Sequence, residues 1–401
     1  MRIAICQPLV PKYRVPVFDL LGAQPGIELT VYAGTSSGSL DAAAPSDHFT
    51  VVQSPLVRHS FGITYQIVQA AQVEAVDKSR HDLLILPWDA HYRSGFRAID
   101  QARRVGLPVV VWGHGYSKRR GRPWATVLRN RMGRRADAVM LYTHTVADRL
   151  VQRYGFDAQR VFVAQNALDQ RPIQAARAHW LARPEALAAF RREHQLNPEH
   201  TVIFVSRLEP DNHCEVLIHA LADVRAAVPD ARLVLVGKGP TQEALATLAK
   251  ALEQSDHVTF AGAIYDEDEL APWMLSSALF CYPSNIGLSI LHAFGYGLPV
   301  VTGDNLATHN PEIEALQPGV NGLLCRDLDP GAMARRWQEL FADPALRQRC
   351  GAAGRQLVLR KYTVPNMVQG FLDATRLVDQ VERRVVVPSS YTQLATETAA
   401  L

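Results

Sequence analysis

The sequence predicts an α/β protein with two Rossmann-like, doubly wound domains that face a cleft. Short apolar segments alternate with amphipathic ones along most of the chain, a pattern typical of parallel βαβ units. A chain of 401 residues exceeds one ordinary hydrophobic core, so two domains are expected. The stretch 169–200 has no strand pattern and separates the two halves. Ligands of such sheets bind at the carboxyl ends of the strands, so we expect the site there.

In the first half, apolar runs predict strands and amphipathic runs predict helices. The predicted strands are Arg2–Cys6, Glu28–Tyr32, Leu83–Leu86, Pro108–Trp112, Ala138–Tyr142 and Val161–Ala164. The predicted helices are Pro16–Leu21, Gln66–Val76, Gly95–Val105, Trp124–Arg134 and Thr145–Tyr154. These elements predict an N-terminal domain over residues 1–168.

A helical connector over 169–199, with a helix from Ala175 to Ala189, leads to a C-terminal domain over 200–360. Its predicted strands are Thr201–Val205, Arg232–Val236, Val258–Phe260, Ala278–Tyr282, Pro299–Val301 and Gly322–Leu324. A late helix is predicted at Asn366–Leu377, within residues 361–385. The Thr- and Ala-rich residues 386–401 are expected to be a disordered tail.

Composition narrows the class of protein. Apolar residues make up 48% of the chain, which suits a globular fold, and the net charge of +3 indicates no nucleic-acid partner. The five cysteines are scattered, so buried thiols are favoured over a disulfide framework. No signal peptide is apparent at the N-terminus, and no run reaches about 18 apolar residues, the length of a membrane span. We expect a cytoplasmic protein.

The most informative segment is YPSNIGLSILHAFGYGLPVVT, from Tyr282 to Thr302. An apolar strand leads through a turn into a helix that begins near Gly287. Gly295 and Gly297 are expected to end this helix, and a second apolar strand follows it. A helix N-terminus after a strand presents backbone amides and a positive dipole end to an anion. Glycine at position 287 would let a phosphate approach the backbone closely.

This segment resembles the donor-binding signature of the family 4 retaining glycosyltransferases, the group 1 type that includes bacterial polysaccharide and O-antigen enzymes. The matching residues are Gly287, Leu288, Leu291, Ala293, Gly297, Pro299, Val300 and Val301. The two glutamates of the signature, which contact the donor sugar and the nucleotide ribose in the family, fall on Ser284 and His292. The resemblance places Ser284, Asn285, Ile286, Gly287, Leu288 and His292 in the donor site.

The resemblance implies the GT-B fold, whose terminal helix crosses back to the first domain. It also implies metal-independent, retaining hexosyl transfer from a nucleotide-diphosphate sugar, which is a co-substrate, with no cofactor. The implied acceptor is a glycan or a lipid-diphosphate-linked saccharide in cell-surface polysaccharide or lipopolysaccharide synthesis. No carboxylate base is visible, which suits a mechanism in which the leaving phosphate takes the acceptor proton.

Arg207, in Val205-Ser206-Arg207-Leu208, matches the family's diphosphate-binding arginine, and a guanidinium fork suits phosphate. The family's lysine falls on Asn212. The alternatives are a surface arginine for Arg207 and a helix N-cap role for Asp211 or Asn212.

The next strand ends in Gly237-Lys238-Gly239, where the family lines the nucleotide with Gly-x-Gly. A tight turn would need the same glycines, and Lys238 could supply the charge that Asn212 lacks. Ile264, after Phe260-Ala261-Gly262, corresponds to a segment that borders the base in the family.

Two acidic triplets, Asp266–Asp268 and Asp327–Asp329, have a spacing that could hold a divalent metal. Each precedes a helix, so N-cap and first-turn roles are the preferred interpretation, and no metal site is predicted.

In the first half, His114 ends a strand between two glycines, where a side chain would meet a ligand. A loop-stabilising role is the alternative. Lys12, Tyr13 and Arg14 replace glycines of the family and are expected to contact an anionic or acceptor group.

The run Tyr116–Ala136 holds eight cations and no acid, including Lys118, Arg119 and Arg120. A solvated basic face is one interpretation. The other is contact with a lipid-diphosphate acceptor or with the anionic inner membrane surface, with Trp124 and Leu128 dipping into it.

Two further motifs match the family in part. Asn166 and Asp169 match a hinge motif, although turn chemistry would explain both. Glu312 matches a Glu-Ile pair and is a candidate for the donor site, or a first-turn residue.

The missing glutamates leave two alternatives open: a catalytically weakened sugar-nucleotide-binding partner of another transferase, and a GT-B sugar-nucleotide epimerase. They also lead us to expect a donor with a deoxyribose nucleotide or a 6-deoxyhexose. A neutral imidazole at position 292 accepts one ribose hydroxyl, whereas a glutamate accepts both.

Overall fold

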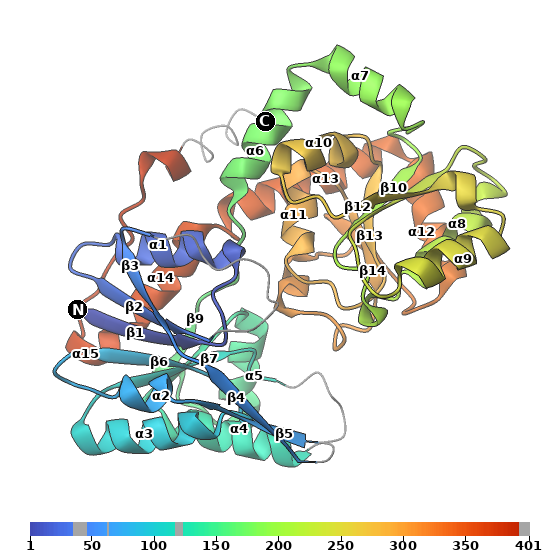
Figure 1. Cartoon of the computed structure of the whole chain (residues 1–401). Helices are drawn as coiled ribbons and strands as arrows, with labels where there is room; N and C mark the ends of the chain where they lie inside the picture. Colours follow the sequence, from blue (N-terminus) through green and yellow to red (C-terminus); the bar gives the residue numbers. More distant parts are fainter. Residues whose placement is uncertain (35–45, 62–63, 117–122, 393–401) are drawn as a thin grey trace. The chain divides into compact units, whose positions relative to one another are not determined.

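The computed structural model describes residues 1–34, 46–61, 64–116 and 123–392. The chain divides into two compact units, each with its own parallel sheet (Figure 1). Unit 1 consists of Met1–Ala167 and Val364–Pro388, and unit 2 of Leu168–Thr363 and Ser389–Leu401. The predicted α/β class with two Rossmann-like sheets is confirmed.

Unit 1 contains a parallel seven-stranded sheet of order β3-β2-β1-β6-β7-β8-β9. The direction of winding changes beside β1, which pairs with β2 on one side and with β6 on the other. The strands are β1 (Arg2–Gln7), β2 (Glu28–Ala33), β3 (Phe49–Gln53), β6 (Leu83–Pro87), β7 (Val109–Gly113), β8 (Ala138–Leu141) and β9 (Val161–Val163).

Helices cover both faces of this sheet (Figure 1). One face packs on α3 and α4 through a core that includes Cys6, Leu86, Ile99 and Met132. On the other face α1 packs against α14. The helices are α1 (Val15–Gly22), α2 (Ala71–Glu74), α3 (Arg93–Val105), α4 (Pro123–Arg135), α5 (His144–Tyr154), α14 (Val364–Ala374) and α15 (Arg376–Asp379).

The predicted helix Gln66–Val76 is wrong. Its first part is strand β5 (Thr64–Gln69), which pairs antiparallel with β4 (Leu56–Phe61), and only Ala71–Glu74 is helical. Val57 lies opposite Val68 in this ribbon, and Arg58 lies 4.0 Å from the ring centroid of Tyr65. These cross-strand contacts stabilise a strand where the local sequence alone suggests a helix.

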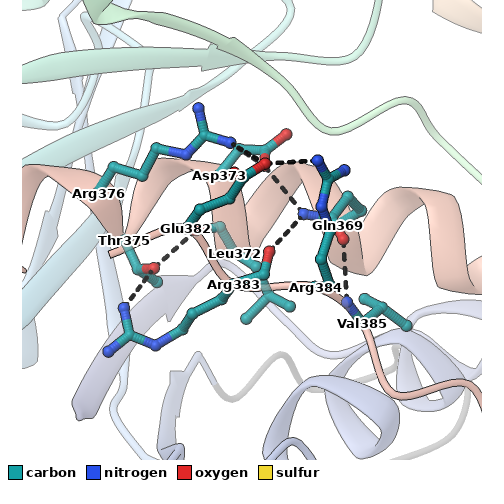
Figure 2. A network of polar contacts seen from close by, with 9 residues as sticks. All are labelled: Gln369, Leu372, Asp373, Thr375, Arg376, Glu382, Arg383, Arg384 and Val385. Carbon is teal, nitrogen blue, oxygen red and sulfur yellow. Dashed lines mark hydrogen bonds and ion pairs between the residues drawn. The ribbon is translucent and has the colours of Figure 1, made fainter. Parts of the chain in front are cut away.

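After α15 the chain continues as an extended segment, to which Gln369 of α14 is hydrogen-bonded (Figure 2). Gln369 donates from Nε2 to the carbonyl of Arg383 at 2.9 Å and accepts from the Val385 amide at 3.0 Å. The Val386 amide donates to Gln24 Oε1 on the strand-connecting segment after α1, at 2.7 Å. The predicted tail therefore includes bonded residues at its start, while residues 393–401 lie outside the described part of the chain.

Unit 2 contains a parallel six-stranded sheet of order β12-β11-β10-β13-β14-β15. Here the winding changes direction between β10 and β13, which pair through Val202 and Leu279. The strands are β10 (Thr201–Val205), β11 (Arg232–Val236), β12 (Val258–Gly262), β13 (Leu279–Tyr282), β14 (Val300–Gly303) and β15 (Gly322–Cys325).

The helices of unit 2 enclose this sheet, and the predicted connector helix proves to be two helices. Because Pro184 has no N–H, α6 ends at Leu181 and α7 begins at Pro184. The helices are α6 (Gln170–Leu181), α7 (Pro184–Glu193), α8 (Glu215–Arg225), α9 (Gln242–Ala251), α10 (Glu267–Leu275), α11 (Ser289–Tyr296), α12 (Pro330–Ala342) and α13 (Pro344–Arg360).

All five cysteines are buried and free, as the sequence predicts. Within the described ranges, none of the helices combines the length and the apolar composition of a membrane span.

Candidate functional site

A cavity of about 640 Å³ lies in unit 2 where β10 and β13 end. These neighbouring strands lie on either side of the change in winding direction, which is where open α/β sheets bind ligands. The volume suits a small-molecule ligand. The lining residues are Ser206, Arg207, Glu209, Pro210, Asp211, Asn212, Tyr282, Asn285, Gly287, Leu288, Ser289 and Asn310.

Arg207 lies at the cavity in the loop that follows β10. Its side chain is 67% exposed, and its guanidinium forms an ion pair with Glu209 Oε1 at 2.7 Å. The lining carries Arg207 as its cation and Glu209 and Asp211 as carboxylates, for a formal charge of −1. An anionic ligand would therefore have to draw Arg207 away from Glu209.

Asn212, where the family has its lysine, is buried and shapes the same loop. Its Nδ2 donates to the Arg207 carbonyl at 2.6 Å, and its Oδ1 accepts from Asn285 Nδ2 at 3.2 Å. The predicted N-cap role is wrong: Asp211 and Asn212 lie in the 3-10 helix Pro210–Asn212, and α8 begins later, at Glu215.

The loop after β13 is held by a polar segment, residues 308–310. The fully buried His309 accepts from the Ile286 amide at Nδ1 (3.3 Å) and donates from Nε2 to the Gly303 carbonyl (2.9 Å). The Asn310 amide donates to the Ile286 carbonyl at 2.9 Å, and Asn310 Nδ2 donates to the Asn285 carbonyl at 2.9 Å.

These bonds preset the loop's shape. Asn285 adopts a left-handed conformation with φ of 63°, which asparagine tolerates better than most residues. Asn212, Asn285 and Asn310 thus form a chain of amides along the cavity. Amides offer both donors and acceptors, which suits a polar, hydroxyl-rich ligand.

Tyr282 is the last residue of β13, and its hydroxyl donates to Ser206 Oγ at 3.1 Å. Burial raises the pKa of Tyr282 to about 12, although the Ser206 bond opposes this. Tyr282 is therefore a neutral hydroxyl that links the ends of the two strands.

Gly287 lines the cavity just before α11. A Cβ at this position would lie 3.2 Å from Asn310 Nδ2, so a larger residue would crowd the loop. Gly297 ends α11 with φ of 80°, as predicted, but Gly295 continues the helix. A Cβ at Gly295 would lie 2.3 Å from Gln170 Oε1, so this glycine permits the close approach of α6.

His292 lies on α11 and forms a cluster with Glu267 and Tyr296. Its Nε2 donates to Glu267 Oε1 at 2.8 Å, and the Tyr296 hydroxyl donates to the same oxygen at 2.5 Å. Burial raises the pKa of the Glu267 carboxyl, but the bonds from His292 and Tyr296 outweigh burial, so the net pKa lies below its ordinary value. Because Nε2 is bonded to Glu267, Nδ1 is the ring nitrogen that remains, and only a neutral imidazole can accept a hydrogen bond there.

Four of the residues expected at the donor site lie outside the cavity lining: Ser284, Ile286, His292 and Glu312. Ser284 donates to Thr308 Oγ1 at 3.0 Å, and Ile286 belongs to the core. Glu312 is 4% exposed, in the 3-10 helix Pro311–Ala315.

Gly237 and Gly239 bring the end of β11 against the Arg207 loop. A Cβ on Gly237 would lie 1.9 Å from the Ser206 carbonyl oxygen, and one on Gly239 2.3 Å from that of Leu208. Their glycine identity is thus explained by backbone packing. The exposed Lys238 and the partly buried Ile264 lie outside the cavity lining.

The acidic triplets act as helix starts, as preferred from the sequence. Asp266 accepts from the amides of Asp268 and Glu269, and Asp329 accepts from the Ala332 amide. Across the described parts of the chain, no group of histidine, cysteine or carboxylate side chains could hold a metal ion.

The predicted residues of the first half lie in unit 1, at the carboxyl end of its sheet. His114 is exposed after β7, with ring contacts to Tyr116 and Tyr142. Lys12 and Tyr13 are exposed, whereas Arg14 is buried, with its guanidinium 5.0 Å from the Trp112 ring centroid. Arg14 as a surface contact is therefore not supported.

The cations of the basic run Tyr116–Ala136 have different surroundings. Lys118, Arg119 and Arg120 lie outside the described residues. Arg129 is buried, and burial lowers its pKa, while Arg135 pairs with Asp100. Arg131 and Arg134 are exposed on α4, as are Trp124 and Val127 at 53% and 67%.

The hinge motif has a local explanation. Asp169 caps α6 by accepting from the Arg171 amide at 3.0 Å, and it forms an ion pair with the Arg171 guanidinium at 2.7 Å.

Sequence reasoning missed the residues that hold the loops: Glu209, His309, Asn310 and Glu267. The only local signal was the polar run Thr308-His309-Asn310 before Pro311, which is typical of a turn.

Comparisons with known proteins identify the family. Residues 188–357 match "Glycosyl transferases group 1", and residues 22–171 match "Glycosyltransferase Family 4". A D-inositol 3-phosphate glycosyltransferase of Frankia alni is 30% identical over 293 residues, 66% of this chain and 68% of the relative. The chain belongs to the group 1 glycosyltransferases and is a transferase.

Two further similarities agree with this class. A GDP-mannose-dependent alpha-(1-6)-phosphatidylinositol monomannoside mannosyltransferase of Mycolicibacterium smegmatis is 29% identical over 276 residues, 65% of this chain and 68% of the relative. The crystal structure of Anabaena HepE in complex with UDP has a TM-score of 0.70 at 17% identity, covering 92% of this chain and 98% of that chain. The predicted GT-B fold is thereby confirmed.

Proposed function

We propose that this chain transfers a hexose from a nucleotide-diphosphate sugar to a hydroxyl of a glycan or lipid-linked saccharide, with retention and without a metal ion or cofactor. The observation that carries the proposal is the cavity where β10 and β13 end, with Arg207 on one side and Gly287 at the opening of α11 on the other. A guanidinium and a helix N-terminus are both suited to a diphosphate.

Arg207 is the residue that would neutralise the leaving diphosphate. It would exchange Glu209 for phosphate, and the exchange costs little because an exposed ion pair contributes about 0.2–1 kcal/mol. As the sugar departs, negative charge grows on the leaving phosphate, where a fixed cation and backbone amides stabilise it most. The phosphate then takes the acceptor proton, so this step needs no carboxylate base. Lys238 and His114 remain candidates for further contacts with phosphate or sugar.

The relatives support a nucleotide sugar as donor. HepE has been crystallised with UDP and with UDP-glucose, and the mycobacterial relative is named as GDP-mannose-dependent. The latter acts on a phosphatidylinositol monomannoside, which supports a lipid-linked acceptor here. Synthesis of a cell-surface polysaccharide, including lipopolysaccharide, is the role we propose.

We further propose that the site demands a ribose 2′-hydroxyl less strictly than its family does. The Glu267 bond occupies one nitrogen of His292, so the ring offers one acceptor where the family offers a carboxylate. A thymidine-diphosphate sugar is the proposed donor. The 6-deoxyhexose expected from Ser284 is not proposed, because that side chain is buried outside the cavity lining.

A second candidate is a binding partner that assists another transferase. The formal charge of −1 on the cavity lining and the buried bond of Ser284 favour it. A panel of nucleotide sugars, incubated with the protein and a saccharide acceptor, separates the functions. Release of nucleoside diphosphate with a lengthened acceptor supports transfer, binding alone supports the partner, and an isomerised sugar nucleotide would indicate an epimerase.

We propose that the protein works in the cytoplasm at the inner membrane surface, with α4 as the contact. Trp124, Val127 and Arg131 recur at a helical spacing and are exposed together. Replacing Trp124 and Val127 by serine should reduce cosedimentation with anionic vesicles, and equal cosedimentation would contradict the contact.

A further inference from the structure

A second cavity, of about 480 Å³, lies in unit 1 and is surrounded by arginines. The residues that line it are Arg103, Pro108, Arg134, Arg135, Ala136, Asp137, Arg160 and Leu377. Four cations thus converge from α3, from α4 and from the turn before β9. Two of them, Arg134 and Arg135, come from the acid-free run that the transferase function leaves unexplained.

The cavity is separate from the carboxyl end of the sheet. Pro108, Asp137 and Arg160 directly precede β7, β8 and β9, so they mark the amino-terminal edge. His114 lies at the other end of β7, at the carboxyl-terminal edge of the sheet. Strand residues rise about 3.3 Å each, so the amino-terminal and carboxyl-terminal edges lie more than about 10 Å apart. A ligand in this cavity would not occupy a site at the carboxyl end.

Two of the four arginines are held by backbone carbonyls before any ligand arrives. Arg160 donates to the carbonyls of Ala136, at 2.7 Å, and Asp137. Arg134 donates to the Tyr154 carbonyl at 2.5 Å and lies 5.1 Å from the Phe156 ring centroid. A guanidinium carries several N–H groups, so an arginine anchored by one or two carbonyls keeps donors for a ligand. Anchoring also reduces the entropy lost on binding.

The charge balance favours a dianion. Asp137 accepts from the Val109 amide at 2.8 Å and Asp100 pairs with Arg135, so two carboxylates offset two of the four cations. The remaining formal charge of +2 matches a phosphomonoester, and arginine forks bind phosphate in two-point fashion.

We propose that this cavity binds a phosphomonoester group, and that Arg103, Arg134, Arg135 and Arg160 are its ligands. The group is carried either by a small soluble molecule or by a lipid headgroup. The site lies outside the donor cavity and does not depend on the proposed donor.

The test is calorimetric titration of the full chain with inorganic phosphate. The double variant Arg103→Gln/Arg134→Gln should weaken binding by about tenfold or more, because two exposed cations are lost. The control Arg97→Gln/Arg104→Gln removes two exposed arginines of α3 that do not line the cavity and should leave the affinity unchanged.

Vesicles distinguish the two sources of the phosphate. If vesicles with phosphatidic acid bind the wild type and the control better than the cavity variant, the source is a lipid headgroup. If phosphate binding alone responds, the source is a soluble ligand. Equal phosphate affinity in both double variants, or none in the wild type, would overturn the proposal. Should the double variant unfold, the single Arg103→Gln change, which removes no bond described here, gives the same comparison.

Discussion

Replacing His292 by glutamate, which restores the residue of the family signature, should destabilise this protein. In the structure the imidazole donates to Glu267 Oε1 at 2.8 Å, and the two side chains are only 14% and 24% exposed. The change exchanges a donor for a second carboxylate. Two carboxylates about 4 Å apart repel by about 4 kcal/mol at an effective dielectric constant of about 20.

This repulsion sets an upper limit, because one carboxyl can take up a proton. We expect His292→Glu to lower the free energy of unfolding by about 2–4 kcal/mol at pH 7, from repulsion and the lost charged hydrogen bond. Repulsion raises the pKa of one carboxyl in the folded state, so the loss should shrink as the pH falls toward 5. Urea unfolding at both pH values measures this.

The double variant His292→Glu/Glu267→Gln is the matched control. An amide at position 267 can donate to the new carboxylate, so most of the lost stability should return. A single variant as stable as the wild type, or a double variant no better than the single, would refute the pairing. The double variant is also the background in which to compare thymidine and uridine diphosphates, since the single change would mix instability with affinity.

Further predictions concern the cavity and the acidic residues. Glu209→Gln should tighten nucleoside diphosphate binding about two- to fivefold in calorimetry, because it removes a competitor for Arg207 worth up to about 1 kcal/mol. Asp266→Ala should cost about 1 kcal/mol in urea unfolding through loss of the N-cap. The lowered pKa of Glu267 makes its charged form stabilising, so the wild type should lose stability as the pH falls below about 4.5, and Glu267→Gln should lose less.

Most of the sheet framework could be predicted from sequence, because its strands are buried apolar runs such as Leu83–Pro87. The ribbon β4–β5 could not. Its strands mix polar and apolar residues, and their pairing depends on a partner that no local pattern reveals.

The candidate site also combines residues that the sequence could predict with residues that it could not. Arg207 and Gly287 line the cavity and belong to motifs that are contiguous in the sequence. Asn310 and Glu267 each lie 25 residues from their partner in the signature segment, and only the folded chain brings them together. Asn212 shows the opposite error: its N-cap chemistry was plausible locally, but the side chain turns back to the Arg207 carbonyl.

The measurement that tests the central claim most directly is nucleoside diphosphate binding and sugar transfer by Arg207 variants. Arg207→Ala should weaken binding by about 1.5–3 kcal/mol and lower transfer, Arg207→Lys should restore it only in part, and the exposed control Arg349→Ala should match the wild type. Transfer by the wild type should persist in excess chelator. Unchanged affinity in both Arg207 variants, or transfer that stops until Mg²⁺ or Mn²⁺ is returned, would contradict the account.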